Sequence, residues 1–255
     1  MKALPHQTFN QKPYASGRLR ALLTILLLAM GAACGVVSMI VNASMAGTLR
    51  GAGDISAPYE LGESALELLY VGITLLQLVV FCATALAFSL WLHRAYRNLP
   101  ALGADRLDTT PGWAVAYFFI PFVNLYKPFQ AVREIWRESA PGAEARESFG
   151  GVSARVGASA LLGWWWGCWI TANVAGRASE RAADMAGSIE GTLLASWVSI
   201  AADALFVSAA VLAILIVKRI DEMQESKFGG MGTQGPPPPP DSFEMPHAVG
   251  RERDG

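Results

Sequence analysis

The chain has 255 residues, of which 53% are hydrophobic and only 16% are charged, and its formal net charge is −1 at pH 7. Soluble domains carry about 25% charged residues, so this composition argues against an ordinary water-soluble domain. The near-neutral balance gives no sign of a nucleic-acid partner.

Four stretches are apolar enough to cross a bilayer, which takes roughly 20 mostly apolar residues. They cover about 21–41, 68–92, 156–176 and 191–217. The first three contain no charged side chain, and the fourth contains only Asp203. Because backbone amides in hydrocarbon must be paired within their own segment, each stretch is predicted to be a helix. The expected fold is an all-α integral membrane four-helix bundle.

The first of these stretches has two interpretations. Its flank is basic, and Ser44-Met45-Ala46 loosely resembles the cleavage site of a signal peptide. Its apolar run of about 21 residues, however, exceeds the 7–15 residues of a signal-peptide core. We therefore interpret it as a span that remains in the protein, with cleavage as the alternative.

Lys and Arg residues are divided unequally between the two sides of this topology. With the N-terminus inside, the outer side holds only Arg50, Arg177 and Arg181 of the 20 basic residues. Basic residues are enriched on the cytoplasmic side of membranes. We expect an inner (plasma) membrane protein with a cytoplasmic segment 1–20, a membrane domain 21–225 and a cytoplasmic tail 226–255. The tail is Gly- and Pro-rich and is predicted to be disordered.

Residues 111–138, the hairpin segment, are also apolar but are not predicted to span. Pro121 and Pro128 each remove a backbone donor and clash with the preceding turn of a helix. We expect a broken amphipathic hairpin, re-entrant or interfacial, between the second and third spans. Thr110 caps its first helix, which ends near Ile120, and the second runs from Pro128 to about Glu138.

The hairpin segment combines eight aromatic residues with basic neighbours, a composition that favours the headgroup level of a membrane. The rings either lie at that level or pack against the spans as core. The interfacial candidates are Thr110, Pro111, Gly112, Trp113, Pro121, Asn124, Lys127, Pro128, Arg133, Glu134 and Trp136.

Two stretches of sequence resemble a known family. AYRNLP at 95–100 and TPGWAVAYFFIPFVNLYKPFQAVREIW at 110–136 are similar to a bacterial membrane family catalogued as domain of unknown function 4328. The similarity covers about 60–219, with mild departures at Ala116 and Tyr126. The resemblance implies a multi-pass membrane protein with this signature on its cytoplasmic side. It implies no known activity and therefore no catalytic residues.

A polar layer is predicted inside the membrane around Asp203. A charge at the bilayer centre costs roughly 2.5–3.5 kcal/mol, so such a residue is a functional candidate. Gln77 and Thr171 lie at nearly the same depth, estimated from the 1.5 Å rise per helical residue. We expect Asp203 to face the bundle interior and to hydrogen-bond Gln77 or Thr171, either as interhelical glue or as an ion or proton site.

Glycines and tryptophans in the spans suggest helix contacts. Gly31-x-x-x-Gly35 and Gly163-x-x-x-Gly167 have the spacing that permits two helices to approach closely. Four tryptophans sit near the middle of the third span, where they either pack against other helices or form the wall of a ligand site. They are Trp164, Trp165, Trp166 and Trp169.

No catalytic motif is present, and we expect neither a metal nor a cofactor. Cys34, Cys82 and Cys168 lie in apolar runs and are interpreted as small hydrophobic residues. We expect a non-enzymatic polytopic membrane protein that docks a lipid or a protein partner, including a second copy, through the aromatic and basic hairpin segment. The alternative is a transporter or channel subunit in which Asp203 is a proton or cation site.

Overall fold

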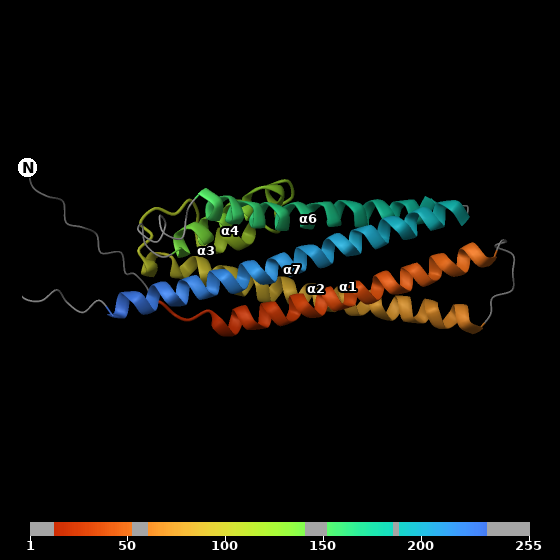
Figure 1. The fold of residues 1–255 in the computed structure, drawn as a ribbon, viewed down its shortest axis with the longest axis horizontal. Coiled ribbons are helices and arrows are strands. Elements are labelled where there is room, and N and C mark those ends of the chain that lie inside the picture. Colours follow the sequence, from red (N-terminus) through yellow and green to blue (C-terminus); the bar gives the residue numbers. More distant parts are fainter. Residues whose placement is uncertain (1–12, 53–60, 141–151, 186–188, 234–255) are drawn as a thin grey trace, which may run out of the picture.

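The computed structural model describes residues 13–52, 61–140, 152–185 and 189–233. Over these residues the chain is all-α, as predicted, with no strand. The four long helices run side by side along the longest axis (Figure 1). They are α1 (Arg18–Ala52), α2 (Leu61–Asn98), α6 (Val152–Met185) and α7 (Ile189–Thr233). The short helices α3 (Pro111–Ala116) and α4 (Lys127–Ser139) lie at one end of the bundle, here called the hairpin end.

Three of the long helices are long and apolar enough to cross a membrane: Arg18–Arg50, Val71–Asn98 and Glu190–Met231. Their apolar side chains point largely outward, since only 6% of the most apolar window of α2 is buried inside the protein. Exposing apolar surface to water costs roughly 25 cal/mol per Å², whereas lipid chains solvate it. The structure therefore supports a membrane protein.

Helix α6 covers the predicted third span but does not meet the same hydropathy criterion within the described residues. Its centre contains four tryptophans together with Gly163 and Gly167, residue types that count as weakly polar in mean hydropathy. It nevertheless runs alongside α7, against which it packs (Figure 1). Composition thus supports α1, α2 and α7 as spans, whereas a span formed by α6 stays a prediction.

Helices α1 and α6 both pack against α7, and α2 packs mainly against α1. A Cβ atom on Gly35 would come within 2.9 Å of Cγ2 of Val207, closer than real Cβ contacts. Helices α1 and α7 therefore approach closely at this point because residue 35 has no side chain. Gly163 and Gly167 have no such neighbour within 4 Å in the described part of the chain.

The hairpin segment folds into short helices separated by a break. Thr110 caps α3 by accepting a hydrogen bond from the backbone N–H of Trp113 at 3.4 Å, and Pro111 occupies the first helical position. The prediction that this helix ends near Ile120 is wrong, because α3 ends at Ala116 and the next residues form tight turns. The residue before a proline disfavours helical geometry, so the chain leaves the helix ahead of Pro121.

Large buried side chains gather at the hairpin end, where α3 and α4 cover α2 and α7. They include Trp91, Leu92 and Tyr96 of α2, Leu99 just after α2, Val132 and Ile135 of α4, and Ile216, Val217 and Ile220 of α7. Full burial of one such side chain stabilises a protein by about 1.5–3 kcal/mol. A hydrophobic core therefore holds the hairpin segment against the long helices.

One predicted boundary needs correction at the end of the chain. Helix α7 continues to Thr233, so residues 226–233 are helical and do not belong to the predicted tail. Lys227 ties this extension to α4, because its Nζ donates a hydrogen bond to the carbonyl oxygen of Glu138 at 2.7 Å. The rest of the predicted tail, with its five prolines, and residues 1–12 lie outside the described residues.

Candidate functional site

Glu134 anchors the hairpin segment from inside the protein. It is only 5% exposed, and its carboxylate accepts hydrogen bonds from the Tyr96 hydroxyl at 2.6 Å and from the backbone N–H of Asp108 at 2.7 Å. The Tyr96 oxygen also accepts from the backbone N–H of Thr109 at 3.2 Å. Glu134 therefore joins α4, α2 and the connection that leads into α3.

A second buried polar network lies beside the first and joins α2, α4 and α7. The amide of Asn98 donates to the carbonyl oxygen of Ala15 at 3.0 Å and to Oε1 of Gln224 at 3.3 Å. Gln224 Nε2 donates to the carbonyl oxygen of Ala95 at 2.9 Å and to Ser139 Oγ at 3.0 Å. Buried polar groups are costly unless they are hydrogen-bonded, and here they pair with one another.

The hairpin segment also presents an exposed aromatic surface. Its members are Trp113, Phe119, Phe122 and Tyr126, which are 54%, 68%, 86% and 60% exposed. The backbone of Phe122 has a φ of 64°, a conformation that residues other than glycine rarely adopt. Such strain costs on the order of 1–3 kcal/mol and persists only where surrounding contacts fix it. The core contacts of α3 and α4 on either side provide that constraint.

The remaining interfacial candidates are spread over the segment. Four of them are exposed: Lys127, Arg133, Gly112 and Pro121. Asn124 and Trp136 are half-buried, and Pro128 is buried in the first turn of α4. Arg137 is paired, because its Nε donates to Glu138 at 2.9 Å, and this hydrogen bond raises the pKa of the Arg137 guanidinium. The exposed basic residues thus lie on the same segment as the aromatic surface.

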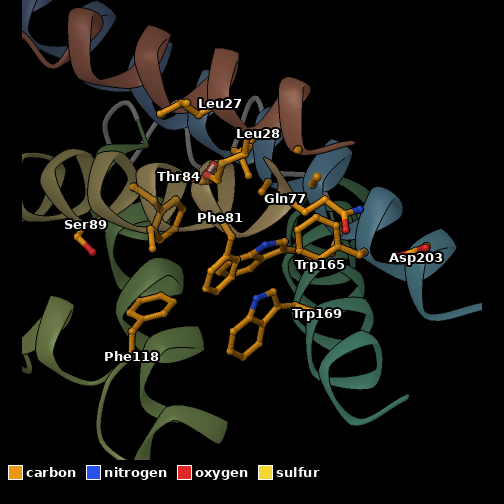
Figure 2. A pocket seen from close by; sticks show the side chains of 18 of the residues that line it. Leu27, Leu28, Gln77, Phe81, Thr84, Ser89, Phe118, Trp165, Trp169 and Asp203 are labelled. Atoms are coloured by element: carbon orange, nitrogen blue, oxygen red, sulfur yellow. Dashed lines mark hydrogen bonds between the residues drawn. The ribbon is translucent and has the colours of Figure 1, made fainter. Parts of the chain in front are cut away.

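A cavity of about 520 Å³ opens between α1, α2, α6 and α7. Seven of its nineteen lining residues are aromatic: Phe81, Phe88, Phe118, Phe119, Trp165, Trp169 and Phe206. Phe118 and Phe119 follow α3 directly, so the hairpin segment supplies part of the wall (Figure 2). In Figure 2, Asp203 lies toward one end of the cavity and Phe118 and Ser89 lie toward the other.

Two of the three polar candidates meet at this cavity. Asp203 and Gln77 line it, whereas Thr171 is exposed on α6 and is not part of the lining. The predicted partners of Asp203 are wrong, because its carboxyl group interacts with the side chain of Ser38 on α1. Gln77 instead donates from Nε2 to the carbonyl oxygen of Cys34 at 3.3 Å. The partners of Asp203 and Gln77 in the polar layer therefore come from α1 and not from α6.

A family model described as "Domain of unknown function (DUF4328)" matches residues 61–222, more than half of the chain. The chain belongs to the DUF4328 family. No curated protein and no solved structure matches it. The DUF4328 region runs from α2 into α7, so it includes the hairpin segment and three of the four helices that line the cavity. Helix α1 lies outside the matched region.

Asn98 and Glu134 lie in the two stretches that resemble DUF4328, and both are buried in the networks described above. Sequence reasoning missed their partners Tyr96 and Gln224, as well as Ser38 near Asp203. A Gln in the charged stretch after the fourth span, or a Ser within an apolar run, gives no pattern that separates a buried partner from a surface residue. These partners come from helices distant in sequence, so only the fold reveals them.

The sequence left two roles open for the tryptophans of α6: packing against other helices, or forming the wall of a ligand site. In the structure, different tryptophans fit each role. Trp165 and Trp169 line the cavity, whereas Trp164 is 70% exposed on the outer face. Trp166 stacks on Trp169 with ring centroids 4.8 Å apart, and its Nε1 donates to the carbonyl oxygen of Leu125 at 2.9 Å. This hydrogen bond gives the indole N–H a partner and fixes the tip of the hairpin segment beside α6.

Proposed function

We propose that this protein is a non-enzymatic, four-span membrane protein that binds a membrane lipid. The hairpin segment lies at the cytoplasmic headgroup level, as a re-entrant or interfacial element, and an acyl chain occupies the cavity beside it. Both termini are cytoplasmic and the protein resides in the bacterial inner membrane. The observation that carries the proposal is the aromatic cavity, part of whose wall comes from the hairpin segment.

The size and chemistry of the cavity suit an acyl chain. Small-molecule sites typically have volumes of about 300–1,000 Å³ and mostly apolar walls. Each buried CH₂ group of a chain contributes about 0.8 kcal/mol, so several methylenes in the cavity provide useful affinity. Asp203, Gln77, Thr84 and Ser89 are the polar residues of a mostly apolar lining and would orient a ligand rather than supply most of its binding energy.

The exposed rings of the hairpin segment support the proposed placement at the membrane surface. Trp and Tyr prefer the interface between headgroups and acyl chains, and Trp113 and Tyr126 are both more than half exposed. Lys127 and Arg133 add positive charge, worth about 1 kcal/mol each near an anionic leaflet. Replacing Arg133 by glutamate should therefore weaken retention of anionic lipid without unfolding α4, because this side chain is exposed.

Filling the cavity tests the proposal directly. Ala85→Trp places a large ring in the lining of the cavity, and Ala87→Trp is the matched control because Ala87 is half-buried on the same helix but is not part of the lining. Each variant is purified in mild detergent, and the lipid that remains bound is extracted and quantified by mass spectrometry. We expect Ala85→Trp to retain much less lipid per protein than Ala87→Trp at similar thermal stability. Equal lipid retention in the two variants would refute the proposal.

A second function, transport, is favoured by one observation: Asp203 lines the cavity together with Gln77. In this alternative the protein is a transporter or channel subunit, and Asp203 is a proton or cation site. Purified protein reconstituted in liposomes is assayed for proton or cation flux, with Asp203→Asn as the variant that keeps the shape but cannot ionise. Flux that Asp203→Asn abolishes supports transport, and absence of flux above that of empty liposomes rejects it.

A further inference from the structure

Four cationic or ionisable side chains gather where α1 begins and α2 ends. Arg20 comes from the first turn of α1, and His93, Arg94 and Arg97 come from the last two turns of α2. Arg20, Arg94 and Arg97 all act electrostatically on His93, and Arg20 and Arg97 act on Arg94. We call this group the basic cluster.

The basic cluster has no counter-charge of its own in the part of the chain that the structure describes. Its members form no ion pair with any described carboxylate. Glu225, at the same end of the bundle, is already engaged by the Tyr14 hydroxyl at 3.0 Å, by Ser16 and by Arg18 Nε at 3.9 Å. Like charges held together without a partner repel one another, and an anion bound among them would relieve this repulsion.

Arg94 gives the strongest sign of a missing ligand. Its Nε atom is buried, yet it has no hydrogen-bond partner among the described residues. A buried donor without an acceptor costs about 1–3 kcal/mol, and more when the group is charged. Native proteins rarely leave such a group unpaired unless something outside the chain supplies the acceptor.

We propose that the basic cluster binds a phosphate group, with Arg94 as its central ligand. The guanidinium fork of arginine matches two oxygens of a phosphate, and Arg20 and Arg97 add positive charge nearby. Arg20 directly precedes the apolar run 21–41 and His93 directly follows the run 68–92. Lipid phosphates lie at that boundary, so the source of the phosphate is the headgroup of an anionic phospholipid.

The site is separate from the lipid-binding cavity, because none of its four members lines that cavity. It does not depend on the acyl-chain proposal either. Loss of lipid in Ala85→Trp and loss of headgroup binding in Arg94 variants are independent outcomes, so one proposal can fail while the other holds.

The test separates a binding role of Arg94 from a role in topology. Arg and Lys count equally in directing membrane orientation, so Arg94→Lys leaves insertion unchanged but removes the Nε donor and the fork. Arg106→Gln is the control for charge alone, because Arg106 is an exposed basic residue on the same predicted side. Delipidated protein in detergent is titrated with phosphatidylglycerol, phosphatidylcholine or inorganic phosphate, and binding is followed by native mass spectrometry and by thermal shift.

We expect wild type and Arg106→Gln to bind phosphatidylglycerol in preference to phosphatidylcholine. Arg94→Lys should weaken binding about tenfold or more, as expected for the loss of one charge-assisted hydrogen bond. Wild-type affinity in Arg94→Lys, or equal binding of the two lipids by wild type, would overturn the proposal. If inorganic phosphate alone protects the wild type and loses this effect in Arg94→Lys, the phosphate site stands and its ligand is a soluble phosphate.

Discussion

Removal of the Glu134 carboxylate provides a sharp test of how the hairpin segment is held. Glu134→Ala leaves the Tyr96 hydroxyl and the Asp108 backbone N–H without their acceptor in a buried position. A hydrogen bond to a charged group contributes about 1.5–3 kcal/mol, so losing two destabilises the protein by roughly 3–6 kcal/mol. Tyr96→Phe removes one of these bonds and the acceptor for Thr109, and should cost about 2 kcal/mol.

A variant that combines Glu134→Ala with Tyr96→Phe distinguishes the loss of this network from general damage to the core. Because the two side chains share a hydrogen bond, their effects should not add, and a double-mutant cycle should give a coupling energy of about 1–2 kcal/mol. Unfolding is measured in mixed micelles by tryptophan fluorescence. Glu222→Gln serves as the control, since Glu222 is about half exposed and only pairs with Arg219 at 3.8 Å. Additive effects of the two substitutions would refute the proposed anchoring role.

Gly35→Ala should destabilise the protein by about 1–3 kcal/mol through its clash with Val207, whereas Gly163→Ala should be neutral or slightly stabilising; thermal unfolding of both variants checks this. Trp166→Phe keeps most of the ring but loses the hydrogen bond to Leu125, and should increase proteolysis near the hairpin tip at a cost of about 1 kcal/mol. In a cysteine-free background, an impermeant thiol reagent added to intact cells should label Arg181→Cys but not Arg106→Cys, both positions being exposed. Labelling of both positions or of neither would contradict a span between them, and the reverse pattern would contradict the predicted orientation.

The sequence determined the membrane character, the all-α class and the position of the broken segment. These features depend on local properties: a run of about 20 apolar residues needs lipid around it, and prolines such as Pro121 and Pro128 interrupt a helix wherever the chain lies. The cap at Thr110 was predictable for the same reason, because a cap involves only neighbouring residues. The family resemblance, which rested on the hairpin segment, is confirmed by the match over 61–222.

Only the tertiary structure decided which side chains meet. Gln77 and Thr171 have similar predicted depths, but the rotation of each helix about its axis places Gln77 at the cavity and Thr171 on the outer face. Depth follows from counting residues, whereas facing depends on packing against neighbours, which four apolar helices with similar surfaces do not specify locally. The same reason explains why Ser38 near Asp203, Tyr96 beside Glu134 and the unpaired Nε of Arg94 emerge only when α1, α2, α4 and α7 are assembled.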